Sequence, residues 1–464
     1  MKEPSPRPVD APSGQPQEAD RLREILHAPG YVMILVYSAL IGIPVSLIAF
    51  WFLVGLHELQ NVFWSELPHH LGWDEAPWWW PLPLLLIAGL IVGLIAGRLT
   101  GGGGHIPAGG LHAGATTPAA LPGVVLAAAA SLPLGAVLGP EAPLVALGGG
   151  LALLFRDLTR TPVTPQITAL LGAAGAAAAI AAIFGNPLIA AVLLIEVSGI
   201  GGPQLFAVML PALLSSGIGA LVFTGFGQWT GLETGSLNLT LPTPLPRLDP
   251  ADVLWTLLIA LVLAVLLNPV LEAGRRVAAF VSGRVLPRTV LCALGAAACA
   301  AVYALITGRT PADVALSGQA TLGELAADPQ AWGVGALIAV LLLKTLAYAL
   351  CLGSMRGGAI FPAVFLGAAA GALVAPLPGL GAVPAMAAGM AAATAAVMRL
   401  PVSSVVLVVL LLGSSAMIPI AILAAVISFA TTELLPAGTA HPPAPLSEQP
   451  EDTGGPGAGA AGAP

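Results

Sequence analysis

Charged side chains are scarce in this chain of 464 residues: Asp, Glu, Lys and Arg together make up 8% of it, against about a quarter in a soluble globular domain. Because 57% of the residues are hydrophobic, too little polar surface exists to cover a water-soluble body. The composition therefore excludes a soluble protein and predicts one embedded in a lipid bilayer. The formal net charge is −7 and no basic stripe is present, so a nucleic-acid partner is not expected.

Cysteines and catalytic motifs are also few. The three cysteines lie in apolar segments without CxxC spacing, which predicts neither a disulfide framework nor a metal site: Cys292, Cys299 and Cys351. The segment His57–Asn61 begins like the HExxH motif but lacks the second histidine, and no GxSxG serine motif occurs. The glycines of Gly101–Gly104 are not followed by the lysine of a phosphate-binding loop. We therefore expect neither an enzyme nor a cofactor.

Long apolar runs fill the chain between residues 31 and 434, and many of them contain glycine or proline. The 56 glycines and 43 prolines are too many for a bundle of uninterrupted membrane-spanning helices. A span needs about 20 residues. Five apolar blocks are interrupted sooner, within about 12 to 17 residues, and begin at Glu141, Pro187, Ile360, Pro384 and Pro401. We expect an all-α polytopic membrane protein in which these blocks are half-helices.

The chain divides into four parts by composition. These are a polar leader (1–29), a first membrane repeat (30–240), a second membrane repeat (241–435) and a low-complexity tail (436–464). The tail has too few large apolar side chains to fold, so we expect it to be disordered. Arginines precede the first span, whereas the loop after it carries acids without Lys or Arg. The positive-inside rule then predicts a multi-pass protein of the cell membrane with a cytoplasmic N-terminus.

The two membrane repeats share a sequence pattern. Gly139–Gly148 and Gly358–Gly367 both match G-x-x-x-P-x-V-x-L-G. In each half a glycine then stands twelve residues before a proline, in an alanine-rich run: Gly175 before Pro187, and Gly389 before Pro401. Interrupted helices at corresponding places in two halves are typical of transporters whose binding site lies near the membrane midplane. The pattern predicts two helical repeats that meet there.

A helix that begins inside the membrane has a specific chemistry. Its first backbone N–H groups have no acceptor within the helix, and each unmet group costs several kcal/mol in hydrocarbon. The partial positive charge at the helix start favours an anion as the acceptor. Three G-x-x-x-P segments suit such starts: Gly103–Pro107, Gly139–Pro143 and Gly358–Pro362. We expect the three to aim their amides at one common site for a small anion.

These segments resemble the motifs of the CLC family of chloride channels and proton-coupled chloride transporters, whose patterns are G-S-G-I-P, G-R-E-G-P and G-x-F-x-P. The family's N-A-P-L segment has its counterpart in FGNPLIAAVLLIE, at 184–196, and Lys344 precedes GSMRGGAIFP. All four motifs occur in the family's order. The segments GPE and GGAIFPAVFLG are similar to those of a divergent bacterial subgroup of ion channels. The resemblance implies a CLC-like fold of two inverted-topology repeats, a homodimer with one pore in each subunit, and chloride or another small anion as the transported species.

Carried over residue by residue, the resemblance makes Glu141 the gating glutamate, although it could be an ordinary acid at a helix start. Its implied anion-binding positions are Gly103, Gly104, His105, Ile106, Gly139, Ala142, Ala359, Ile360 and Phe361. Several depart from the family. The family serine that touches chloride is replaced by Gly104, and His105 replaces a glycine, where it either donates to the anion or caps the mouth of the pore. Ile360 occupies the phenylalanine position, and no tyrosine follows Tyr348 to serve as the family's pore tyrosine.

The internal proton site departs as well. Val197 stands where exchangers carry a second glutamate, and Glu196, one residue earlier, is a weak surrogate. A neighbouring helix position points about 100° away, so we expect Glu196 to face the cytoplasmic vestibule or a neighbouring helix. Passive, channel-like conduction is favoured. The alternatives are a proton-coupled chloride or fluoride antiporter and, more remotely, a non-conducting scaffold. Lys344 is either a selectivity charge near the pore or a lysine that reaches the interface or pairs with an acid.

Overall fold

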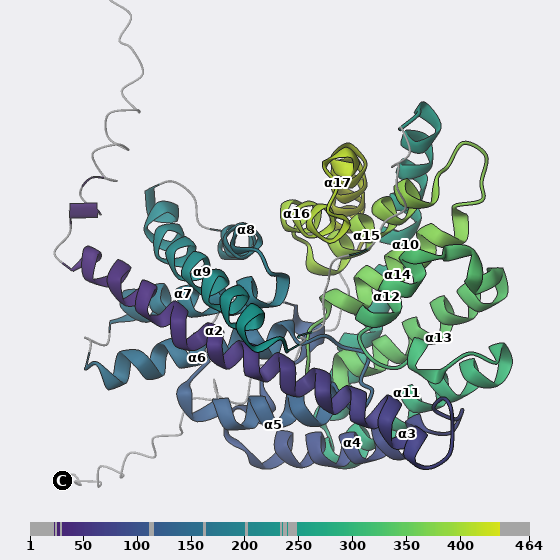
Figure 1. The fold of residues 1–464 in the computed structure, drawn as a ribbon, viewed down its shortest axis with the longest axis horizontal. Helices are drawn as coiled ribbons and strands as arrows, with labels where there is room; N and C mark the ends of the chain where they lie inside the picture. The colour runs from purple at the N-terminus through teal and green to yellow at the C-terminus, as the bar shows by residue number, and fades with distance from the viewer. Residues whose placement is uncertain are drawn as a thin grey trace, which may run out of the picture.

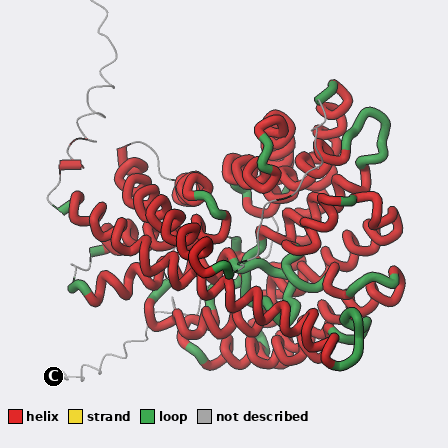
Figure 2. The backbone as a smooth tube through the Cα atoms, viewed as in Figure 1, coloured by secondary structure: helices red, strands yellow, loops and turns green. Residues whose placement is uncertain are grey.

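The computed structural model describes residues 30–110, 116–160, 164–199, 203–232 and 248–436, together with 23, 26, 27, 234 and 239. Almost all of the described chain is helical (Figure 2). The predicted tail lies outside the described residues from 437 onward. The predicted leader also lies outside them, except for its three described residues and the turn at Gly30 that comes next.

Eight helices of the described chain are long and apolar enough to cross a membrane. Two of them include short flanking turns: Tyr31–His70 joins α2 (Tyr31–Asn61) and α3 (Leu67–His70), and Pro329–Ser354 includes α13 (Gly333–Ser354). The others are α4 (Pro81–Arg98), α7 (Pro165–Phe184), α9 (Pro203–Thr230), α10 (Pro250–Ser282), α11 (Val285–Thr307) and α17 (Ile418–Leu434). The expectation of an all-α polytopic membrane protein is confirmed.

The remaining helices are short. They are α5 (Leu121–Ser131), α6 (Glu141–Leu158), α8 (Pro187–Ser198), α12 (Gln319–Ala327), α14 (Ile360–Val374), α15 (Ala382–Met398) and α16 (Pro401–Leu412). Four of the five expected half-helices, α8, α14, α15 and α16, have 12 to 17 residues. The fifth, α6, continues to 18 residues. The glycines at 148–150 do not interrupt α6, because they lie buried in its contacts with α5 and α7.

The two repeats lie side by side in the ribbon (Figure 1). Helices α2, α6, α7, α8 and α9 of the first repeat form one group, and α10 to α17 of the second form the other (Figure 1). Helices α3, α4 and α5 run along the bottom of this view, where α4 packs along α11 of the second group (Figure 1). The two groups also meet where α8 contacts α16. The meeting of two helical repeats that the sequence pattern predicted is therefore confirmed.

The glycines of the sequence pattern form a close helix crossing in each repeat. In the first repeat Gly148 of α6 faces Gly175 of α7, and in the second Gly367 of α14 faces Gly389 of α15. A Cβ atom on any of the four would run into the backbone of its partner glycine. Small residues allow such close backbone approach between membrane helices. The repeated glycines thus have a packing role that is the same in both halves.

Lys344 on α13 is fully buried and holds a neighbouring loop in place. Its Nζ donates to four consecutive backbone carbonyls, those of Asp313, Val314, Ala315 and Leu316, at 3.1 to 3.3 Å. The ring of Phe365 lies 4.8 Å from Nζ. Lys344 therefore neither reaches the interface nor pairs with a carboxylate through its own side chain. Its charge is neutralised by carbonyl dipoles, an arrangement that neither sequence interpretation included.

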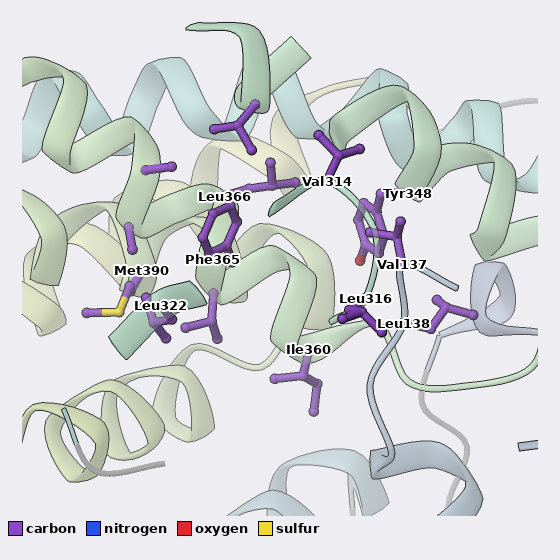
Figure 3. Packing of buried hydrophobic residues seen from close by; sticks show 14 of the residues in the cluster. Val137, Leu138, Val314, Leu316, Leu322, Tyr348, Ile360, Phe365, Leu366 and Met390 are labelled. Carbon is purple, nitrogen blue, oxygen red and sulfur yellow. The ribbon is translucent and has the colours of Figure 1, made fainter. Parts of the chain in front are cut away.

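The loop held by Lys344 also supports the segment before α6. The amide of Leu316 donates to the carbonyl of Gly135 at 3.2 Å. Figure 3 shows Val314 and Leu316 of this loop near Val137 and Leu138, the residues that lead toward the start of α6. The carboxylate of Asp313 is fixed in turn by Arg309, at 2.8 Å, and by the hydroxyl of Tyr303, at 3.0 Å. The lysine thus positions a connection between the repeats.

We expect Lys344→Met to destabilise the protein strongly. The substitution keeps the apolar stem but removes the donor shared by four buried carbonyls, and leaving a buried acceptor unsatisfied costs about 1 to 3 kcal/mol. Thermal unfolding of the purified protein in detergent, followed by size-exclusion chromatography, should show a midpoint several degrees lower. Leu342→Met on the same helix is the control, because Leu342 is 67% exposed. Equal midpoints for the two variants would contradict the assigned role of Lys344.

Candidate anion site

Helices α6 and α14 begin next to each other, and a backbone bridge joins them. The amide of Gly139 donates to the carbonyl of Gly358 at 2.8 Å, and the amide of Gly358 donates to the carbonyl of Gly139 at 2.6 Å. Each helix begins two residues after its bridged glycine, at Glu141 and at Ile360. Two of the three expected helix starts therefore lie together, and Pro143 and Pro362 stand in the first turns of these helices.

The Glu141 side chain lies across this pair of helix starts. It is 1% exposed, and its Oε1 accepts a hydrogen bond of 2.8 Å from the amide of Phe361. Its Oε2 has no hydrogen-bond partner among the residues that the structure describes. The carboxylate thus occupies an amide at the start of α14, which the sequence analysis assigned to the anion. A negatively charged group is favoured at that place by the helix dipole.

The bridged glycines make room for this carboxylate. A Cβ atom on Gly139 or on Gly358 would collide with the carboxylate atoms of Glu141. Glycine is therefore required at both positions for the acid to lie against the bridge. The first glycine of these two G-x-x-x-P segments consequently does more than allow a turn, because it admits the carboxylate that lies against it.

Tyr348 anchors the start of α14 from the other side. Its hydroxyl donates to the carbonyl of Ala359, the residue immediately before the helix, at 2.7 Å. The ring is fully buried, and Figure 3 shows it near Val137. In the sequence, Tyr348 stands out only as the last tyrosine of the chain. Its contact with the helix start could not be predicted, because no local motif links positions 348 and 359.

The first G-x-x-x-P segment differs from the expectation. Pro107 begins only a three-residue 3-10 turn, Pro107–Gly109, and residues 111–115 lie outside the described chain. Gly110 ends the turn with a φ of 85°, which a continuing right-handed helix does not allow. The prediction of a regular helix that starts at Pro107 is therefore wrong for the described residues. This segment approaches the site as a glycine-rich loop.

That loop nevertheless reaches the start of α6. A small hollow is lined by residues of the loop, of α5, of α6 and of the segment before α14: Gly103, Gly104, His105, Val124, Ala142, Pro143, Ala146, Arg356 and Gly357. The predicted anion-binding residues thus fall into two neighbouring groups. Gly103, Gly104, His105 and Ala142 line the hollow, whereas Gly139, Ala359, Ile360 and Phe361 belong to the bridge and helix start around Glu141. Ile106 lies outside this hollow and packs against the hydrophobic core.

Arg356 is a further charged residue at this site, which no sequence motif predicts. This arginine is 9% exposed and lies in the short connection between α13 and α14. Its position in GSMRGGAIFP, two residues before the bridged Gly358, was the only available signal. It is the charged side chain among the residues that line the hollow, apart from the titratable His105.

Glu196 on α8 contacts a neighbouring helix, one of the two expected orientations. Its Oε1 accepts from the amide of Val402 at 2.8 Å, and its Oε2 accepts from the amide of Ser403 at 2.7 Å. Both amides belong to the first turn of α16, where an acid is favourable. Glu196 therefore caps the start of a helix of the other repeat. Val197 beside it packs against the apolar cluster that includes Ala190 and Leu400.

Comparison with known proteins shows the family. The model of the voltage gated chloride channel family matches residues 108–433. Among curated proteins, the chain is 28% identical over 380 residues to the "Putative ion-transport protein YfeO" of Escherichia coli (strain SMS-3-5), covering 75% of this chain and 81% of that protein. The protein of the same name from Salmonella choleraesuis is 26% identical over 355 residues, covering 73% and 79%.

Solved structures of ion transporters share the fold. A slow cyanobacterial Cl⁻/H⁺ antiporter matches with a TM-score of 0.71 and 18% identity, covering 88% of this chain and 95% of that one. A CLC-type fluoride/proton antiporter matches with a TM-score of 0.65 and 19% identity, covering 87% and 96%. At these identities the likeness concerns the fold. Together with the family model, it shows that this chain belongs to the voltage gated chloride channel (CLC) family of ion-transport membrane proteins.

Proposed function

We propose that the protein conducts a small anion passively across the cell membrane, with chloride as the first candidate. Glu141 is the gate of the pore. The observation that carries this proposal is the hydrogen bond between the Glu141 carboxylate and the amide of Phe361. The acid occupies the kind of acceptor position that a permeating anion needs. Membership of the family supports anion transport as the activity.

The gate works by competition between two negative groups. With the carboxylate ionised, Oε1 holds the Phe361 amide and no anion can bind there. When a proton adds to the carboxylate, the side chain becomes neutral and its attraction to the helix start falls. The amide at the start of α14 then becomes available to the anion. Acid should therefore favour the open pore.

Passive conduction is supported by the surroundings of the expected proton site. Val197 has no group that can carry a proton, and both carboxylate oxygens of Glu196 are hydrogen-bonded to backbone amides of α16. A proton on either oxygen of Glu196 would weaken one of these bonds and the helix cap with it. The residues at this place consequently favour a structural role over a relay that couples proton movement to anion movement.

We infer a homodimer in which each subunit has its own pore, with the N-terminus in the cytoplasm. The dimer is inferred from the family resemblance, and the orientation from the arginines that precede the first span. Crosslinking of the purified protein and accessibility of an N-terminal tag in intact cells test these two statements separately.

The transport activity can be tested with the purified protein in liposomes. Chloride efflux is measured after a potassium ionophore removes the charge imbalance, and the external pH is recorded at the same time. We expect efflux without uphill proton movement. Proton movement against its gradient, in fixed ratio to chloride, would instead establish an antiporter. Absence of flux with chloride, fluoride and nitrate would leave a non-conducting scaffold and overturn the proposal.

A further inference from the structure

The guanidinium of Arg356 is buried, but its hydrogen bonds in the described chain all go to neutral groups. Nε donates to the carbonyl of Gly102 at 3.1 Å, and one terminal nitrogen donates to the carbonyl of Met355 at 3.2 Å. The first of these contacts ties the glycine-rich loop to the segment before α14. Both contacts satisfy single N–H groups of a side chain that has five.

No carboxylate of the described chain forms an ion pair with Arg356, although five other ion pairs occur there. A buried cation in a membrane protein is costly unless an opposite charge or an aqueous cavity compensates it. Arg356 differs in this respect from Lys344, whose ammonium has four carbonyls and an aromatic ring around it. The positive charge of Arg356 therefore lacks a protein partner of opposite sign within the described residues.

The hollow beside Arg356 offers the space for such a partner. It is small, about the size of a water molecule, and its walls are mostly glycine, alanine and proline. Ala142 and Pro143, which line it, belong to the first turn of α6, so the helix start adds partial positive charge. Gly104 leaves this wall without a hydroxyl group. A compact monovalent anion fits both the size and the charge of this place better than a larger solute does.

We propose that Arg356 supplies the positive charge of an anion-binding position in this hollow, next to the position that Glu141 closes. The inference rests on the proposed anion transport and adds a specific side chain to it. The ligand is a monatomic halide, because the hollow is about the size of one water molecule and a polyatomic anion such as nitrate is larger. In this arrangement the guanidinium of Arg356 contacts the anion in place of the serine hydroxyl of the family pattern. It belongs to the second repeat, whereas the serine position, Gly104, belongs to the first.

The test uses the full-length protein and measures anion binding apart from flux. Chloride or fluoride is titrated into the detergent-purified protein, and the increase in unfolding temperature gives the apparent affinity. We expect Arg356→Gln to weaken the affinity by about 10- to 100-fold, as loss of a charge-assisted hydrogen bond does. We expect Arg356→Lys, which keeps the charge but lacks the Nε donor to Gly102, to weaken the affinity less than Arg356→Gln does. The two anion series tell which ligand is preferred.

Two further variants make the result independent of folding defects. Ala146→Leu adds bulk to another residue that lines the hollow, without altering Arg356, and should weaken anion binding to a similar extent. Arg276→Gln removes a cation whose side chain is 71% exposed on α10, and should leave binding unchanged. If Arg356→Gln is poorly folded, Ala146→Leu still tests the site.

The possible results separate this inference from the proposed function. Unchanged anion affinity in both Arg356→Gln and Ala146→Leu would overturn the inference, even if the protein conducts chloride. Anion binding that depends on Arg356 would uphold it, even if liposomes show no flux and the transport proposal fails. Equal loss in Arg356→Gln and Arg276→Gln would also count against it, because the effect would then depend on the overall charge.

Discussion

Glu141→Gln is expected to remove the pH dependence of anion flux and to fix the flux at its acidic value. Glutamine has the shape of the protonated acid and carries no charge, so its carbonyl oxygen competes with the anion for the Phe361 amide much more weakly than a carboxylate does. A charge-assisted hydrogen bond contributes about 1.5 to 3 kcal/mol, which corresponds to about a 10- to 100-fold rise in flux at neutral pH. Liposome efflux is measured from about pH 3.5 to about pH 7.5, because this range includes the ordinary pKa of a glutamic acid, about 4.3, and the neutral region.

Glu196→Gln is the matched control for that experiment. It changes another acid whose oxygens bind backbone amides at a helix start, but in the α16 cap. We expect this variant to keep the pH dependence of the original protein. Flux that still responds to pH in Glu141→Gln would remove Glu141 from the gate. Loss of the response in Glu196→Gln alone would make Glu196 the titrating group.

Gly389→Leu is expected to prevent assembly of the second repeat. The position faces Gly367 across the crossing of α14 and α15, and even a Cβ atom there meets the backbone of the partner. Overpacking by a single group costs about 1 to 3 kcal/mol, and a leucine adds three more carbons at a place where only backbone can move. The yield of monodisperse protein by fluorescence-detected size-exclusion chromatography should fall to near zero.

Glycine substitutions without a steric conflict provide the control. Gly335 on α13 has open space around it, and Gly335→Ala should be stabilising by up to about 1 kcal/mol because alanine favours the helix. Gly148→Leu, at the corresponding crossing of the first repeat, should fail in the same way as Gly389→Leu. Normal yields for both leucine variants would show that the crossings can open, against the packing described above.

The membrane class, the short helices and the two repeats are predictable from the sequence because helix starts inside a membrane need particular residues. Glycine lets the backbone approach a neighbouring group closely, and proline has no N–H that would be left without an acceptor in the first turn. The sequence patterns of Gly139–Pro143 and Gly358–Pro362 therefore predict two helix starts. At Pro107 the same pattern predicts a helix that the structure does not contain among its described residues. There Gly109 and Gly110 end the turn after three residues, and the G-x-x-x-P pattern contains no information about the residues beyond its proline.

The polar contacts that shape the site were not predictable. Lys344, Tyr348 and Arg356 all donate to backbone carbonyls, and any residue can provide a carbonyl. No sequence pattern marks such an acceptor, and the partners of Arg356 and Lys344 lie up to 254 residues away in the chain. The cap that Glu196 forms on α16 was foreseen only as contact with some neighbouring helix, because periodicity gives a direction but not a partner.

Gly139 and Gly358 form a symmetric pair of backbone hydrogen bonds, but the side chains that follow them differ between the two halves. Equivalent atoms donate and accept in both directions, as they do across a two-fold axis, yet the residues two places further on are an acid in one half and Ile360 in the other. A perfectly duplicated chain would set two carboxylates against each other, and their repulsion would keep one of them protonated. Because the two halves differ at this one position, the site has a single ionisable group, Glu141, and the start of the other helix is free to bind its carboxylate.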